Sequence, residues 1–388
     1  MIYLDNAATS AIKPDSVKEA LCQAIRRDDL GNPSRGAHKF SLCALQEVEA
    51  ARSTVSKFFG GKDSQLAFTA NATMSINLIL KSLLRVGDHV ITSCTEHNSV
   101  LRPLYQLEEA GVALSFAGLK KDSFRVDVSS FAQLLRPETR AVVINHASNV
   151  TGEVIDLSAC AQFCREKNLL LIVDAAQSAG IFPINIEADG IDALCFTGHK
   201  SLYGPGGTGG IVLGSRMADV PLKAVISGGS GIRSFEKAQP KEMPTLFEAG
   251  TANVPGLIGL HAGVKYLQDI GMAEVEALLN KLMRRFYEGV KGLPGLKIYG
   301  DFSDPEKRRA PIVGLNLGDV PAAVVSDILA TDFDIATRPG AHCAPLMHRA
   351  LGTVDQGIVR FSFSTMNSVS DIDAGIAAIE ELSRSMIC

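Results

Sequence analysis

The chain has 388 residues, 46% of them hydrophobic and 21% charged, and its 38 basic and 42 acidic residues leave a formal net charge of −4. This length exceeds what one small core needs, so we expect two domains, or one large domain with a smaller partner. The composition is ordinary and shows no basic stripe, which argues against a nucleic-acid ligand.

The N-terminus carries no pattern of a targeting segment. Met1–Leu4 is followed at once by Asp5, without the charged and apolar regions of a secretory signal. No apolar run approaches the ~20 residues that a membrane-spanning helix needs. We therefore expect a soluble, cytoplasmic protein that does not contact a membrane.

Short apolar segments recur through the first two thirds of the chain and mostly do not alternate, which is typical of strands covered on both faces. These predicted strands are Gln65–Thr69, His89–Thr92, Ala113–Phe116, Ala141–Asn145, Leu169–Val173, Ala193–Thr197 and Gly210–Leu213. Helical patterns lie between them, for example Met74–Leu84, Asn98–Ala110 and Ala159–Lys167. This alternation predicts an α/β fold with a mostly parallel sheet flanked by helices.

The last third of the chain has a different organisation. Gly228–Pro255 is rich in Gly, Ser and Pro, which indicates a long ordered loop or an interface segment. Leu257–Val290 reads as a long helix interrupted near Gly271. The remainder predicts a smaller α+β domain, with a strand at Val313–Leu317, a helix at Ala322–Ala330, a loop at Arg338–Pro345, a strand at Val359–Ser364 and a helix at Val369–Ser385.

Lys200 and Asp174 are the residues that point most directly to a chemistry. Each lies at the carboxyl end of a predicted buried strand, where ligands bind in parallel sheets. A lysine amine can form a Schiff base with the aldehyde of pyridoxal 5'-phosphate (PLP), and a carboxylate can keep the pyridine nitrogen protonated. A lone acid at a strand end could instead be a turn or cap residue, but Gln177, three residues later, favours the functional interpretation.

A phosphate site is also predicted near the lysine. Thr197 and His199 flank Lys200 and can donate hydrogen bonds to phosphate oxygens. Phe68–Thr73 forms a turn of small residues before a helix, whose N-terminus attracts anions, and Thr73 adds a hydroxyl. The alternative is that Thr73 is a plain N-cap.

Two glycine motifs resemble nucleotide sites but have the wrong context. Gly204–Gly209 reads G-x-G-x-x-G, yet a predicted strand follows it instead of the helix that a dinucleotide fold requires. Gly198–Ser201 resembles the end of a P-loop, but His199 separates the glycine from the lysine. Both patterns therefore favour a glycine-rich connection behind Lys200.

The segment Arg338–Pro345 should present Cys343 on a short, stiff turn, because proline and glycine restrict it. Arg338 and His342 would favour the Cys343 thiolate. The alternative is a buried structural cysteine. A metal site from His342, Cys343 and His348 lacks a companion ligand pair at a suitable spacing.

The other cysteines have no framework spacing and are expected to be reduced thiols; the eight are Cys22, Cys43, Cys94, Cys160, Cys164, Cys195, Cys343 and Cys388. Cys160 and Cys164 share a helical face, and core packing is favoured over half a metal site. The sequence gives no role for Cys388.

Two further residues could contact a ligand. His97 follows a predicted strand and could stack on a planar ring and move protons. Arg360 lies in a predicted strand, where a half-buried arginine needs an acceptor. A substrate carboxylate or a structural salt bridge would each satisfy it.

Several motifs together resemble those of the cysteine desulfurases, which are PLP enzymes of the class V aminotransferase fold (PLP fold type I), and the resemblance runs nearly end to end. The matching segments are Tyr3–Thr9, Asn32–His38, Thr95–His97, Ser148–Gly152, Val173–Gln177, Thr197–Lys200, Phe247–Thr251 and Arg338–Ala344. The short Arg-x-Gly-x-His-Cys-Ala segment looks like the SufS and selenocysteine-lyase branch, although Pro339 and Ala341 replace its frequent Thr and His.

The resemblance implies how PLP would be held. Lys200 would bind it covalently and shuttle protons, Asp174 would pair with the pyridine nitrogen, Gln177 would bond the phenolic oxygen, and His97 would stack on the ring. The residues that would hold the phosphate are Ala72, Thr73, Thr197 and His199.

The resemblance also implies roles for substrate and partners. Arg360, with Asn149 and Arg338, would bind the carboxylate of L-cysteine, and Cys343 would accept its sulfur as a persulfide. Thr251 would reach the phosphate in the neighbouring subunit of a homodimer. A sulfur-acceptor protein would then receive the sulfur.

We predict a large PLP-binding domain at residues 16–257 and a small domain formed by residues 1–15 and 258–388. The leading hypothesis is a cysteine desulfurase that releases L-alanine. A selenocysteine lyase is the first alternative, and a non-enzymatic sulfur carrier or scaffold on a PLP fold is the second. A nicotinamide-dependent dehydrogenase is disfavoured by the glycine context described above.

Overall fold

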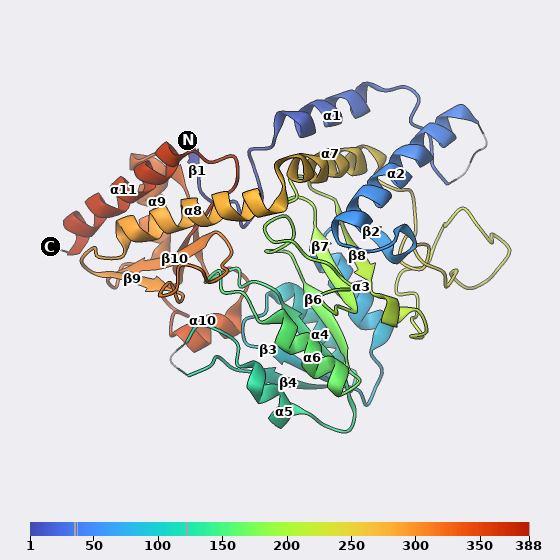
Figure 1. The fold of residues 1–388 in the computed structure, drawn as a ribbon, viewed down its shortest axis with the longest axis horizontal. Coiled ribbons are helices and arrows are strands. Elements are labelled where there is room, and N and C mark those ends of the chain that lie inside the picture. Colours follow the sequence, from blue (N-terminus) through green and yellow to red (C-terminus); the bar gives the residue numbers. More distant parts are fainter. Residues whose placement is uncertain (35, 37, 122, 388) are drawn as a thin grey trace.

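A seven-stranded sheet lies at the centre of the computed structural model, which describes residues 1–34, 36, 38–121 and 123–387 (Figure 1). Its order is β2-β8-β7-β6-β5-β3-β4. The strands are β2 (Leu66–Thr69), β3 (His89–Ser93), β4 (Ala113–Ala117), β5 (Thr139–Asn145), β6 (Leu170–Asp174), β7 (Ala193–Thr197) and β8 (Gly209–Leu213). Only β8 breaks the parallel arrangement, because it runs antiparallel to both β2 and β7. The predicted fold class is therefore confirmed.

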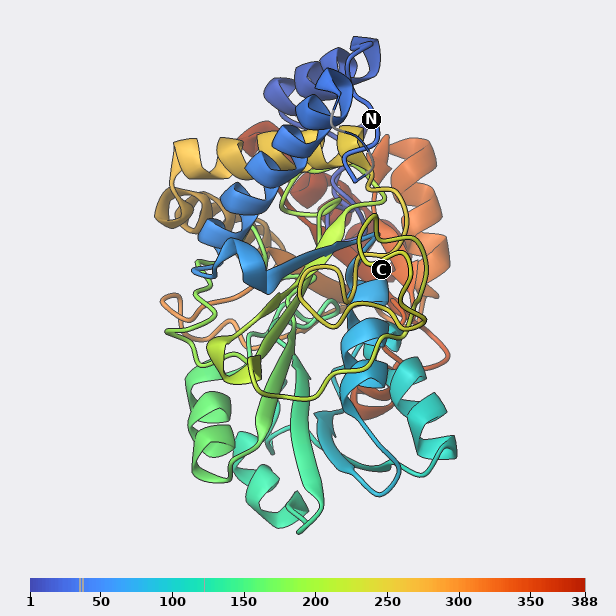
Figure 2. The same cartoon turned by 90° about the vertical axis from the view of Figure 1, so that its right-hand side faces the viewer.

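Helices cover both faces of this sheet, which explains why its strands are apolar on both sides. In β6, Leu171 and Val173 pack into a core with α2, α6 and α7, whereas Leu170 and Ile172 pack into a second core with α3 and α4. Figure 2 shows α3 and α4, in light blue and cyan, on the opposite side of the sheet from the green α6. The helices of this part are α1 (Asp15–Arg26), α2 (Lys39–Phe58), α3 (Ala72–Leu83), α4 (Asn98–Glu109), α5 (Phe131–Leu134), α6 (Leu157–Glu166) and α7 (Val254–Ile270).

The C-terminal part contains a smaller sheet with its own hydrophobic core. Its strands, in the order β12-β13-β10-β9, are β12 (Arg338–Gly340), β13 (Ile358–Ser362), β10 (Ile312–Leu317) and β9 (Leu296–Tyr299). The helices of this part are α8 (Met272–Val290), α9 (Ala322–Asp332), α10 (Pro345–Leu351) and α11 (Val369–Ile387). Strand β1 (Ile2–Tyr3) pairs with β11 (Ile335–Ala336), so the N-terminus lies beside this part (Figure 1). The domain boundaries at residues 15/16 and 257/258 stay a prediction.

Glycine positions mark where several elements begin or end. The long helical pattern is interrupted at Gly271, as predicted, because this residue has a φ of 92° and separates α7 from α8. Gly209, the last glycine of the G-x-G-x-x-G motif, is the first residue of β8, so a strand follows the motif, as predicted, instead of the helix of a dinucleotide site. The prediction of one continuous loop at Arg338–Pro345 was wrong, since this segment begins with β12 and ends where α10 begins.

Within residues 1–34, 36, 38–121 and 123–387, no helix is long and apolar enough to cross a bilayer. Arg35 and Ala37, which belong to the predicted Asn32–His38 motif, lie outside the described residues, and so does Cys388.

Candidate active site

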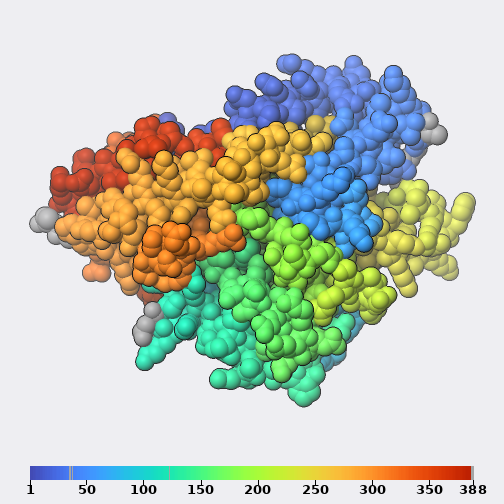
Figure 3. Space-filling view, viewed as in Figure 1, coloured from blue at the N-terminus to red at the C-terminus, as the bar shows by residue number. Residues whose placement is uncertain are grey.

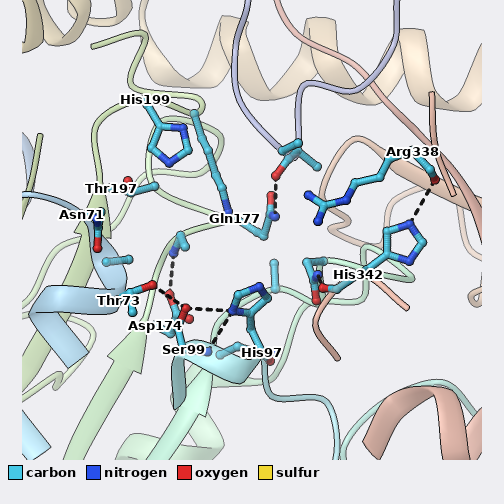
Figure 4. A pocket seen from close by; sticks show the side chains of 18 of the residues that line it. Asn71, Thr73, His97, Ser99, Asp174, Gln177, Thr197, His199, Arg338 and His342 are labelled. Carbon is cyan, nitrogen blue, oxygen red and sulfur yellow. Dashed lines mark hydrogen bonds between the residues drawn. The ribbon is translucent and has the colours of Figure 1, made fainter. Parts of the chain in front are cut away.

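A cavity of about 270 Å³ lies at the carboxyl ends of the central strands, facing the C-terminal part (Figure 4). It brings together all predicted site residues except Cys343 and Thr251. Those that line it are Ala72, Thr73, His97, Asn149, Asp174, Gln177, Thr197, His199, Lys200, Arg338 and Arg360. Residues that are far apart in the sequence thus surround one space.

Asp174 and Lys200 give this cavity one carboxyl group and one amine. Asp174 is the last residue of β6, and its Oδ1 accepts a hydrogen bond from Ala176 N at 2.9 Å. Burial raises the pKa of Asp174, as expected for a carboxylate that has little hydration. Burial also lowers the pKa of Lys200 to about 8, although Asp174 opposes this shift. The amine therefore loses its proton far more easily than an ordinary lysine does.

The first turn of α3 forms the end of the cavity that was predicted to bind phosphate. Asn71 is the N-cap of α3, because its side chain accepts from Met74 N at 2.9 Å; the N-cap interpretation of Thr73 was therefore wrong. The first N–H groups of a helix have no acceptor within the helix. Near them, the buried Thr197 Oγ1 has no hydrogen-bond partner among the described residues. A group with several acceptor oxygens would satisfy these donors.

His97 and Thr73 are joined through Ser99, a contact that the sequence analysis missed (Figure 4). His97 Nδ1 accepts from Ser99 N at 3.0 Å and lies 2.8 Å from Ser99 Oγ. Burial lowers the pKa of His97 to about 4, and Lys200 adds to this shift. The ring is therefore neutral at pH 7, with its proton on Nε2.

His199 and Gln177 contact the N-terminal segment. His199 Nδ1 lies 3.0 Å from Thr9 Oγ1, and Gln177 Nε2 donates to Ala7 O at 3.0 Å. Burial lowers the pKa of His199 to about 4. The N-terminal segment therefore closes one side of the cavity and fixes two predicted cofactor residues.

Arg360 is only 1% exposed, so it is fully buried and not half-buried as expected. Its Nη2 donates to Asp5 Oδ1 at 2.9 Å, and its Nη1 donates to Asn149 O at 3.0 Å. The salt bridge that the sequence left open is thus present, and the sequence gave no sign that Asp5 forms it. A guanidinium has five N–H donors, so Arg360 keeps donors for a ligand in the cavity.

Cys343 does not line the cavity, although its neighbour His342 does. Cys343 is partly exposed, and the two residues have left-handed φ values of 56° and 50°. Burial lowers the pKa of His342 well below its usual range, so the ring is neutral. A neutral imidazole brings no positive charge to the Cys343 thiolate, and the predicted effect of His342 on this thiolate stays a prediction.

The remaining predictions concern metals and the subunit partner. No group of three potential metal ligands occurs in the described part of the chain, and Cys160 and Cys164 are buried in the hydrophobic core. Thr251 is exposed and lies outside the cavity, so its predicted contact with a second subunit stays a prediction.

Glu96 is another residue that the sequence analysis did not select. It is fully buried directly before His97, and Ser93 Oγ donates to its Oε1 at 2.5 Å. Burial raises its pKa to about 8, so this side chain is mostly protonated at pH 7. It therefore adds little negative charge beside Asp174.

The family model for aminotransferase class-V proteins matches residues 2–374. This chain belongs to that family. Proteins of the class-V aminotransferase family are PLP-dependent, which agrees with a cavity that offers a lysine, a carboxyl group and a helix N-terminus.

The similar proteins narrow the family to cysteine desulfurases. A probable cysteine desulfurase from Pyrococcus abyssi is 33% identical across 100% of this chain and 95% of its own length. The cysteine desulfurase IscS from Mannheimia succiniciproducens is 32% identical across 98% of this chain and 92% of its own length. Because IscS is among these relatives, the predicted SufS-like branch stays a prediction.

Solved structures of cysteine desulfurases are also similar to this chain. The apo structure of a cysteine desulfurase from Thermococcus onnurineus NA1 has a TM-score of 0.91, with 32% identity over 99% of this chain and 94% of its own. The cysteine desulfurase CsdA from Escherichia coli, in an S-sulfonic acid form, has a TM-score of 0.88. Its sequence is 29% identical, and the match covers 99% of this chain and 95% of the CsdA chain. This chain thus has the fold of the cysteine desulfurases, which is PLP fold type I.

Proposed function

We propose that this protein is a PLP-dependent cysteine desulfurase, which converts L-cysteine to L-alanine and takes the sulfur onto Cys343 as a persulfide. The observation that carries the proposal is the pair formed by Lys200 and Asp174, an easily deprotonated amine and a buried carboxyl group in one cavity. Similarity to cysteine desulfurases over nearly the whole chain supports the same activity.

The residues of the cavity fit PLP. Asp174 forms no salt bridge among the described residues, although Lys200 favours its charged form from a distance, and a protonated pyridine nitrogen would be a direct cationic partner. The hydroxyl of Thr197 and the first turn of α3 offer hydrogen bonds to a phosphate. When bound, PLP supplies an electron sink that stabilises negative charge on the substrate's carbon atoms.

On the substrate side, each residue would move or hold a defined group. Lys200 Nζ would accept the proton from Cα of L-cysteine, because its pKa of about 8 leaves part of it unprotonated near neutral pH. Arg360, with Arg338, would hold the substrate carboxylate. The Cys343 thiolate would bond to the substrate's sulfur as its C–S bond breaks. The carbon fragment then takes up a proton and leaves as L-alanine.

We also infer that the chain works as a homodimer, with Thr251 reaching the partner's site. The segment between β8 and α7 projects from the molecule, as the yellow region at the right of Figure 3 shows. It exposes Ile232 and Phe235, apolar side chains that a second subunit would cover. A sedimentation experiment that finds only monomer at micromolar concentration would contradict this inference.

A turnover assay tests the proposed activity. The PLP-loaded protein should release L-alanine from L-cysteine and, with a reductant present, sulfide. The variant Cys343→Ser should keep the yellow colour of bound PLP but lose sulfide release. Cys22→Ser is the matched control and should behave as the wild type, because Cys22 is exposed on α1. Undiminished sulfide release from Cys343→Ser would refute the role of Cys343.

A further inference from the structure

The turn that carries Cys343 is in a conformation that needs support. His342 and Cys343 both have left-handed φ values, 50° and 56°, which residues with a side chain adopt at a cost in free energy. Cys343 also lies outside the cavity lining, so its sulfur has to move to meet a substrate there. The contacts that hold this turn are therefore the groups that a movement of Cys343 towards the cavity would have to change.

Two of the hydrogen bonds that hold the turn come from the side of the large sheet. Asn149 Nδ2 donates to His342 O at 2.7 Å, and Asn98 N donates to Cys343 O at 2.7 Å. Two other bonds are local: His342 Nε2 lies 3.1 Å from Arg338 O (Figure 4), and Ala344 N donates to Ala341 O at 2.9 Å. Two successive carbonyl groups of the turn are thus fixed by residues 193 and 245 positions earlier in the chain.

Asn149 links this turn to the arginine that is proposed to bind substrate. Its main-chain oxygen accepts from Arg360 Nη1, and its side chain is buried in the cavity wall. A carbonyl can only accept, so the amide nitrogen must be the atom that faces His342 O. Its Oδ1 has no partner among the described residues. One of the two N–H groups of this amide therefore holds the turn, and the amide nitrogen is the one donor atom of the side chain.

We propose that Asn149 is a positioning residue that couples substrate binding to the release of Cys343. Without substrate, Asn149 Nδ2 holds the His342 carbonyl and keeps the turn closed. A substrate carboxylate on Arg360 then turns this amide nitrogen away from the His342 carbonyl, because an anionic oxygen accepts a stronger hydrogen bond than a peptide carbonyl does. The turn loses one support, and Cys343 can approach the cavity. This inference rests on the proposed function only for the identity of the carboxylate.

The test measures how fast iodoacetamide alkylates Cys343 in the PLP-loaded protein, by mass spectrometry of the peptide that contains it. The peptide with the exposed Cys22 is the internal reference. L-Alanine, the proposed product, supplies the carboxylate without sulfur chemistry. In the wild type, we expect saturating L-alanine to raise the alkylation rate of Cys343 several-fold and to leave that of Cys22 unchanged.

Two variants remove the hydrogen bond in different ways. Asn149→Ala deletes the amide, and Asn149→Asp keeps its shape but cannot donate as a carboxylate. Both should alkylate Cys343 rapidly without L-alanine and respond little to its addition. Asn316→Ala is the matched control, since Asn316 is a buried asparagine whose Nδ2 holds Gly357 O at 2.9 Å away from the cavity. It should respond to L-alanine as the wild type does.

Either of two results would overturn the proposal. One is a wild-type alkylation rate in both Asn149 variants that have a native circular dichroism spectrum. The other is a wild-type rate that L-alanine does not change. In the second case, the visible spectrum of bound PLP separates the causes: a spectral change on adding L-alanine means that the ligand binds without coupling, whereas no change means that the proposed function itself has failed.

Discussion

The cavity wall that carries Lys200 and Asp174 is built differently from the turn beside the cavity that carries Cys343. Asp174 ends β6, an interior strand of the large sheet, and Lys200 follows β7 beside it. Cys343 lies instead in a turn after β12, an edge strand of the smaller sheet, and hydrogen bonds from distant residues hold it. Regular structure thus fixes the groups expected to bind PLP, whereas hydrogen bonds to single residues hold the turn of the expected sulfur acceptor.

Lys200→Ala should have the largest effect, because it removes a group from the rigid wall that nothing else replaces. We expect the yellow absorption of covalently held PLP to disappear and turnover of L-cysteine to fall by about 10²–10⁴-fold, the usual contribution of a general base. Cys343→Ser, in the turn beside the cavity, should lose turnover yet keep the absorption. Equal loss of absorption in both variants would contradict the separate roles of Lys200 in the cavity wall and Cys343 in the turn.

The pH dependence of PLP capture should follow the lowered pKa of Lys200. Only the unprotonated amine attacks an aldehyde, so capture by the apo-protein should become about tenfold slower per pH unit below pH 8. It should level off above pH 8, because the pKa of this amine is about 8. Stopped-flow absorbance measures the rate, with Nα-acetyl-lysine as the control. A rate that keeps rising towards pH 10 would mean that Lys200 is an ordinary lysine.

Thr197→Val should have a smaller effect, with opposite signs in the two states of the protein. The Thr197 hydroxyl is buried and has no partner in the described part of the chain, so its removal should stabilise the apo-protein by about 1 kcal/mol. The same change should weaken PLP binding about fivefold, because one hydrogen bond to the phosphate is lost. Thermal melting and equilibrium dialysis measure the two effects.

Thr73→Val provides the contrast. The Thr73 hydroxyl already bonds Ser99 Oγ at 2.7 Å, so its loss should not stabilise the apo-protein. If Thr197→Val instead destabilised the apo-protein, the Thr197 hydroxyl would not be an unpaired group that is available to a phosphate.

The cavity wall with Lys200 and the turn with Cys343 also differ in how far the sequence predicts their structure. Lys200 and Asp174 were predictable because each follows a short apolar strand, and the ends of parallel strands meet at one edge of a sheet. The salt bridge between Asp5 and Arg360 joins residues 355 positions apart, and no local pattern indicates it. The left-handed backbone of His342 and Cys343 was equally hidden, because that conformation is normally signalled by glycine.

The most direct measurement of the central claim is to reduce the PLP-loaded protein with sodium borohydride and to map the modified residue by mass spectrometry. Reduction converts the link between PLP and an amine into a stable bond. We expect a single pyridoxyl group on Lys200, in the peptide that follows Thr197. A modification on another lysine, or none at all in a protein that remains yellow, would contradict it.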